Sequence, residues 1–146
     1  MVDIALSIAP AGDIVAVDLW NDAVPDFESL HAVRVEPRRW WLIDAGDAAD
    51  AIAELVHDDG TVTPIGGGLL RATLTGNGWR ALLMVGGVFD AEDPGFGPGD
   101  CAATVIHHVP VWIVPLDHDV CAVFFAVSYA GGLVELWTAA IARGLA

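Results

Sequence analysis

Residues 120–127 limit the fold more than any other segment, because they form an uninterrupted apolar run. A strand buried on both faces has this pattern, whereas a strand with one solvated face alternates apolar and polar residues. The sequence therefore predicts a strand at 120–127 that is covered on both sides. The chain has 146 residues, which is close to one ordinary domain and is enough to bury a core without a disulfide or a metal.

Strand patterns outnumber helical patterns along the rest of the chain. Runs of β-branched residues predict strands at residues 2–8, 14–19, 32–35, 40–44, 61–65, 69–75, 102–108 and 111–114. Apolar residues at helical spacing predict helices at residues 47–57, 77–85 and 129–143. Turn residues at 9–13, at 36–39 and at the glycine triplet 66–68 predict that the strands flanking each of them pair as hairpins.

The order of these elements predicts an α+β fold, with about three helices packed on a mainly antiparallel sheet. We expect a single domain over residues 1–146, since no linker or low-complexity tract divides it. The longest irregular segment, residues 90–100, holds four acids, two prolines and three glycines, and predicts an exposed loop. The glycine triplet lacks the spacing and the following helix of a nucleotide-binding fingerprint.

The charge balance excludes several kinds of partner. The chain has 20 acidic residues, six arginines and no lysine, for a formal net charge of −14. It cannot build the basic face that binds nucleic acid, and anionic membrane surfaces are disfavoured for the same reason. Hydrophobic residues make up 55% of the chain. This content, with so few cations, fits a protein that buries part of its surface against another chain.

Membrane insertion and export are not expected. The two most apolar stretches, residues 101–116 and 120–134, are too short for a helix that crosses a bilayer. The first residues carry no cationic region of the kind that opens a signal peptide. Two cysteines are too few for a disulfide framework. We therefore expect a reduced, cytoplasmic protein.

The residues that could carry chemistry do not form a convincing site. Histidines 107 and 108 lie in a predicted strand, where neighbouring side chains point to opposite faces and cannot easily share a metal ion. Asp117, His118 and Asp119 fall between two strands, where a polar turn is expected. We predict no metal site and no catalytic residue.

The two cysteines are also expected to be unreactive. Asp100 precedes Cys101, and a neighbouring acid raises the pKa of a thiol and lowers its reactivity. Cys121 begins an apolar strand and is expected to be a small core residue.

Half of the arginines, Arg34, Arg38 and Arg39, gather at one predicted hairpin. Two interpretations stay open: they bind an acidic ligand or a neighbouring chain, or the surrounding acids neutralise them within the molecule.

Tryptophans supply the other interface candidates. Trp40 and Trp41 are consecutive in one predicted strand, so they face opposite sides of its sheet and one of them lies on the outer face. Trp112 and Ile113 are also consecutive in a predicted strand, so one of these two residues likewise lies on an outer face. Large aromatic side chains on an outer face are enriched at protein interfaces. The candidate interface residues are Arg38, Arg39, Trp40, Trp41 and Trp112.

A series of short motifs runs along residues 31–143. In chain order they are Pro37-Arg38-Arg39-Trp40-Trp41-Leu42, Leu69-Leu70-Arg71-Ala72-Thr73-Leu74-Thr75-Gly76, Trp79-Arg80-Ala81-Leu82-Leu83, Gly97-Pro98-Gly99-Asp100-Cys101-Ala102, His108-Val109-Pro110-Val111, Ser128-Tyr129-Ala130 and Leu136-Trp137. In its order and spacing, this series resembles the gamma subunit of heterotetrameric sarcosine oxidase.

The resemblance has consequences for both fold and function. That family is similar in fold to the folate-binding domain of glycine-cleavage aminomethyltransferases, which implies intertwined half-units, here about residues 1–67 and 68–146. It also implies a non-catalytic gamma-type subunit that acts in assembly and protein–protein contact within a sarcosine oxidase-like flavoenzyme complex. Such a chain binds no cofactor alone and meets flavin only through a larger partner subunit.

Two alternatives remain open. The first is a free-standing tetrahydrofolate-binding protein of the same fold. The stretch Val109-Pro110-Val111-Trp112-Ile113 lacks the carboxylate that folate chemistry uses in the aminomethyltransferases, which argues against transferase activity. The second alternative is a self-associating module, a homo-oligomer with no enzyme partner.

Overall fold

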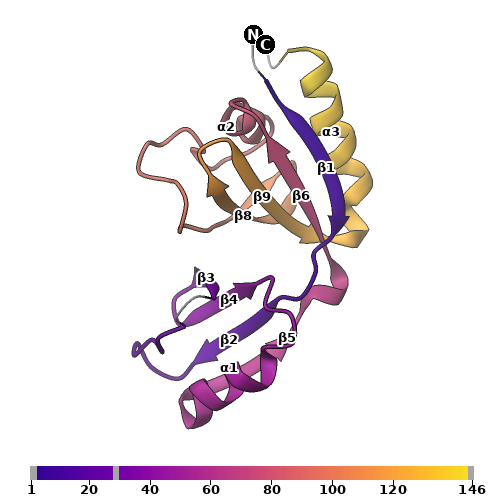
Figure 1. Ribbon diagram of the computed structural model, residues 1–146. Helices are drawn as coiled ribbons and strands as arrows, with labels where there is room; N and C mark the ends of the chain where they lie inside the picture. Colours follow the sequence, from indigo (N-terminus) through magenta and orange to yellow (C-terminus); the bar gives the residue numbers. More distant parts are fainter. Residues whose placement is uncertain (1–2, 28–29, 145–146) are drawn as a thin grey trace. The chain divides into compact units, whose positions relative to one another are not determined.

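The computed structural model describes residues 3–27 and 30–144 and contains two antiparallel sheets and three α-helices. The predicted α+β class is therefore confirmed. The residues divide into two compact units, one formed by Pro10–Gly68 and the other by Met1–Ala9 together with Leu69–Ala146. Figure 1 shows the elements of each unit.

The Pro10–Gly68 unit is a four-stranded sheet with one helix. Its strands, in the order β3-β4-β2-β5 across the sheet, are β2 (Val15–Leu19), β3 (His31–Glu36), β4 (Arg39–Ile43) and β5 (Gly60–Pro64). Helix α1 (Ala49–Val56) is followed by a short 3-10 turn, His57–Asp59. The helix buries Ile52 and Val56 against alternate residues of the sheet, among them Val15, Val17 and Leu42. Helical and strand periodicity thus bring together the apolar residues that form this core.

The larger unit is a five-stranded sheet with two helices packed on one face. Its strands, in the order β1-β6-β9-β8-β7, are β1 (Ala5–Pro10), β6 (Leu69–Thr75), β7 (Ala102–Ile106), β8 (Val109–Asp117) and β9 (Val120–Ala126). The helices are α2 (Trp79–Met84) and α3 (Ala130–Ala142). Trp79, Leu83, Leu133 and Trp137 from these helices join one cluster with inward residues of the strands. Strand β9 lies in the middle of the sheet, and its residues 121–125 are all buried.

Two of the predicted hairpins are wrong. The segments on either side of residues 9–13 belong to different sheets, because β1 pairs beside β6 whereas β2 pairs with β4 and β5. In the same way β5 and β6 flank the glycine triplet but do not pair. Residues Gly66–Gly68 form a 3-10 turn through which the chain leaves one sheet and enters the other. Turn residues indicate that the chain changes direction. They do not show whether the next strand pairs with the previous one or enters another sheet.

Two segments lead from one sheet to the other, and we call them the crossing segments. They contact each other inside the Pro10–Gly68 unit, at residues 12–14 and 65–66. The amide of Ile65 donates to the carbonyl of Ile14 over 2.9 Å. A Cβ atom built on Gly66 would overlap the carbonyl oxygen of Gly12, so the close approach requires glycine at position 66.

The hairpin between β7 and β8 also differs from prediction. His107 and His108 lie in its two-residue turn and not in a strand. Both have positive φ, 49° and 68°, as the central residues of a type I′ turn must. Strand β8 is longer than predicted because it contains both prolines, and Pro115 is accommodated where the register with β9 shifts.

Candidate interaction surfaces

The two candidate tryptophans of β4 face opposite sides of its sheet. Trp40 is half-buried on the side of α1, where its ring centroid lies 5.8 Å from that of Phe27. Trp41 is 3% exposed and pairs with Ala16 of β2 and Val33 of β3. Neither is exposed, and their use at an interface stays a prediction.

The candidate arginines are held by acids of their own unit. Arg38 occupies the β3–β4 turn with a φ of 65°, and its Nε lies 3.0 Å from Asp22 Oδ1. Arg39 lies 3.6 Å from Asp18 and 4.0 Å from Glu36, measured between side-chain nitrogen and oxygen atoms. Such partly exposed ion pairs each contribute about 0–1 kcal/mol, so this chain's own acids compete only weakly with a partner's carboxylate.

Trp112 belongs to the larger unit, whereas the other four candidate residues belong to the Pro10–Gly68 unit. It lies half-buried on β8, opposite Ala103 of β7 and Phe124 of β9.

Neither cysteine forms a disulfide, and burial favours the neutral thiol form of both. Cys101 is partly buried and Cys121 is fully buried. Burial raises the pKa of the Cys101 thiol to about 12, and burial likewise raises the pKa of Cys121. A nucleophilic cysteine requires the thiolate, which neither residue holds at neutral pH.

The histidines do not gather into a metal-ligand set. The His107 and His108 ring centroids lie 5.9 Å apart at the β7–β8 turn. His118 lies in the β8–β9 turn, with its Nε2 3.8 Å from Asp119 Oδ1. Within residues 3–27 and 30–144, no group of three or more histidine, cysteine or carboxylate side chains is placed to hold a metal ion.

The acidic loop is anchored by Arg80, a residue that the sequence analysis did not single out. The Arg80 guanidinium donates to the carbonyl oxygens of Ala91 over 2.8 Å and Phe96 over 2.7 Å. Its Cζ lies 4.4 Å from the centroid of the Trp79 ring. Carboxylates of the loop also accept backbone N–H bonds, as when Asp93 accepts from Gly95 over 2.8 Å. The signal in the sequence is a single cation on the short apolar helix that precedes four acids.

Replacing Arg80 with methionine is expected to release this loop. The substitution keeps the aliphatic stem and removes the charged donors, so we expect the free energy of unfolding to fall by about 1–3 kcal/mol. Cleavage within residues 90–100 by a protease is expected to accelerate. The exposed Arg34 provides the matched control, and Arg34→Met should change neither measurement. Equal cleavage rates for the two variants would show that Arg80 does not hold the loop.

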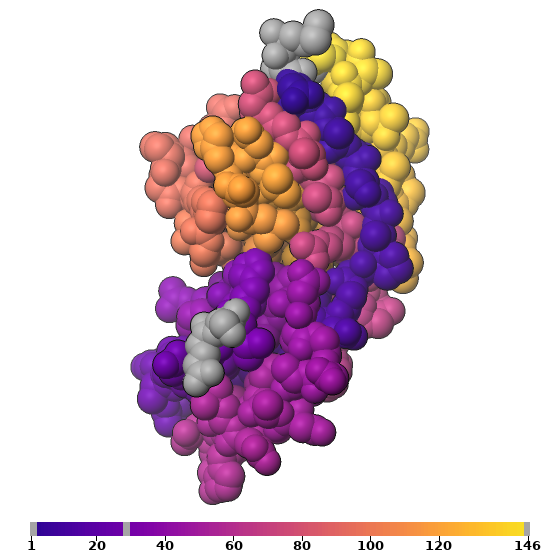
Figure 2. Space-filling view, viewed as in Figure 1, coloured from indigo at the N-terminus to yellow at the C-terminus, as the bar shows by residue number. Residues whose placement is uncertain are grey.

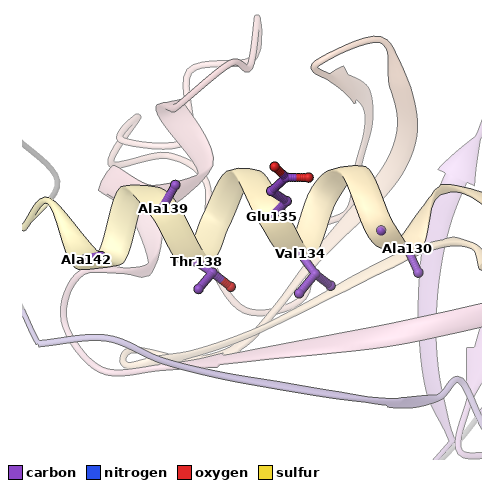
Figure 3. Close-up of a pocket in the computed structure, with 7 residues that line it drawn as sticks. Ala130, Val134, Glu135, Thr138, Ala139 and Ala142 are labelled. Carbon is purple, nitrogen blue, oxygen red and sulfur yellow. The ribbon is translucent and has the colours of Figure 1, made fainter.

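The outer face of α3 is unusually apolar for an exposed helix surface. It carries a shallow groove of about 650 Å³, whose lining is almost entirely apolar and includes one charged residue, Glu135. Figure 3 shows the lining residues along the helix. The residues that line it are Ala130, Gly131, Val134, Glu135, Thr138, Ala139 and Ala142. Because Leu133, Trp137 and Ala140 bury the opposite side, α3 is apolar nearly all round. Helices of this kind are normally covered on both sides.

A smaller pocket of about 320 Å³ lies in the Pro10–Gly68 unit, lined by residues that include Phe27, Ile52 and the carboxylate of Asp26. Its volume is at the lower end of the range of about 300–1,000 Å³ that small-molecule sites occupy.

The chain superposes on a chain of the heterotetrameric sarcosine oxidase from Corynebacterium sp. U-96, a structure determined in complex with pyrrole 2-carboxylate, with a TM-score of 0.80. The superposition covers 98% of this chain and 86% of that chain at 13% sequence identity. The two chains share a fold.

The fold that the sequence resemblance implied is thus confirmed. No family model matches the sequence, and no curated protein matches it. Within the described residues, no helix is long and apolar enough to span a membrane.

Proposed function

We propose that this chain is a non-catalytic, gamma-type subunit of a sarcosine oxidase-like flavoenzyme complex, in which it acts in assembly and protein–protein contact. The observation that carries the proposal is the fold shared with a subunit of a heterotetrameric enzyme over 98% of the chain. That coverage leaves almost no part of the chain to form a separate functional domain.

The surface chemistry supports the same role. The apolar outer face of α3 is the kind of surface that a larger chain covers, and the raised pKa values of both cysteines remove the strongest nucleophile candidates. In this proposal the flavin and the oxidation chemistry belong to the larger subunit, and this chain contributes contact area. The proposed location is the cytoplasm.

Purification from the source cell tests the proposal. A tagged copy of the chain is expected to elute with a larger, flavin-containing chain and to carry sarcosine-dependent oxygen consumption with it. Native mass measurement then gives the stoichiometry of the complex. If the tagged chain elutes alone, or with itself only, and the preparation shows neither flavin absorbance nor oxygen consumption, the proposed role is wrong. Elution as a homo-oligomer would favour the self-associating module.

A further inference from the structure

Strand β1 leaves one edge of the five-stranded sheet open. It lies at the end of the strand order, and among the described residues it has β6 as its sheet neighbour on one side only. From Ile4 to Pro10 it carries no charged side chain. Leu6 and Ile8 are half-buried against the core, while Ala5, Ser7 and Ala9 are exposed. Unpaired N–H and C=O groups along such an edge are a template for a further strand.

The other sheet edges carry features that oppose strand addition. On the side away from β8, Ile106 of β7 forms a bridge with Gly87. Strand β3 presents the exposed charges of Arg34 and Glu36, and β5 begins with a glycine and ends with a proline. Charged residues, prolines and covering segments are the means by which proteins protect sheet edges. Residues 5–9 of β1 include neither a charged residue nor a proline.

The groove of α3 lies beside this open edge. Successive residues of a helix are rotated by about 100°, so Val134 lies about a quarter turn from the buried Leu133. Leu136 lies on the opposite flank of α3, close to Gly86, which follows α2 in the chain. Ala130, Val134 and Thr138 therefore point away from α2. Figure 3 shows them on the side of α3 along which β1 runs, and Figure 2 shows β1 between β6 and α3 on the surface.

We propose that an extended segment of a partner chain adds to the open edge of β1 and places alternate side chains in the α3 groove. This inference rests on the proposed function, since it identifies the surface through which the subunit docks. An added strand would lie about 4.8 Å beyond β1 and would direct every second side chain toward α3. Backbone hydrogen bonds then provide affinity, and the groove selects the side chains.

The groove also indicates the chemistry of that segment. Its lining is apolar and built largely of small residues, so the inward side chains of the segment are apolar and β-branched. The net charge of −14 favours a lysine or arginine at the ends of the segment, outside the apolar groove. The partner segment is therefore an apolar strand with cationic ends.

A peptide titration tests this surface on the isolated chain. The probe is a capped synthetic peptide of alternating valine and threonine with a lysine at each end. We expect hydrogen exchange at the outward-facing amides of residues 5–9 to slow by about tenfold or more when the peptide is saturating. Thr138→Arg, an exposed groove position, should abolish the slowing because it adds bulk and positive charge. Ala53→Arg, at an exposed position of α1, is the matched control and should retain it.

The native complex provides an independent arm of the test. In the complex purified from the source cell, the same β1 amides should be protected relative to the isolated chain. If a flavin-containing complex forms but β1 remains unprotected, the docking surface is wrong while the proposed function stands. If no complex forms, the proposed function fails, and the peptide result alone decides whether the edge accepts a strand. Protection that appears only as the isolated chain self-associates would identify a second copy as the occupant and overturn the partner proposed here.

Discussion

Replacing Trp79 with alanine is expected to lower the free energy of unfolding by about 3–5 kcal/mol. Trp79 is 1% exposed and is among the largest side chains in the core of the larger unit. Its indole N–H also donates to the carbonyl oxygen of His118 over 2.9 Å, which ties the start of α2 to the β8–β9 turn. Alanine at this position leaves a cavity and also removes this hydrogen bond. Urea unfolding followed by circular dichroism measures the loss.

Two further variants separate these contributions. Trp79→Phe retains most of the apolar volume but cannot donate to His118, so we expect a smaller loss of about 1–3 kcal/mol. Trp20 is 60% exposed and provides the control, because Trp20→Ala should change stability by about 0.5 kcal/mol or less. If Trp79→Ala were no more destabilising than Trp20→Ala, the packing described for α2 would be incorrect.

Replacing Gly66 with alanine is expected to destabilise the Pro10–Gly68 unit by about 1–3 kcal/mol. The added methyl group would overlap the Gly12 carbonyl oxygen, and Ile14 N lies only 3.3 Å away from the built Cβ. Backbone atoms cannot move aside as a flexible side chain can, so the crossing segments must separate. The hydrogen bond from Ile65 to Ile14 is expected to weaken as a result.

The neighbouring glycine is a matched control. A Cβ built on Gly67 meets no atom within 4 Å, so Gly67→Ala is expected to leave stability unchanged or to raise it by about 0.4–1 kcal/mol. Thermal unfolding of the two single variants measures the difference. Equal melting temperatures would show that the contact at Gly66 is not restrictive.

Local patterns in the sequence predicted most elements of this fold. The helix expected at residues 129–143 is observed at Ala130–Ala142, and the strand expected at 69–75 is observed with those same bounds. Such elements depend on the periodicity of neighbouring residues, which a single sequence displays.

The pairing of distant strands could not be predicted in the same way. The alternation of Ile4, Leu6 and Ile8 shows that one face of β1 is buried, but it is equally compatible with β2 or β6 as the neighbour. The β7–β8 turn was missed for a related reason. Histidine is an uncommon residue for two consecutive positive φ values, and the usual glycine or asparagine is absent from that turn.

The surfaces that the structure describes could not be predicted as the single elements were. The use of Arg38 and Arg39 at an interface stays a prediction, and the structure pairs both with acids of their own unit. The groove of α3 and the open edge of β1 were not identified. Small residues such as Ala130 and Ala142 give no chemical signal, and a strand edge becomes visible only when the order of strands is known.

The position of β1 in the larger sheet has a consequence for synthesis on the ribosome. This strand is translated early, yet its neighbour β6 follows only after the whole Pro10–Gly68 segment has been made. A nascent chain extends at about 5–20 residues per second, so β1 spends several seconds outside the exit tunnel before β6 is available. Over that interval the uncharged strand has both of its edges unpaired and open to pairing with another chain.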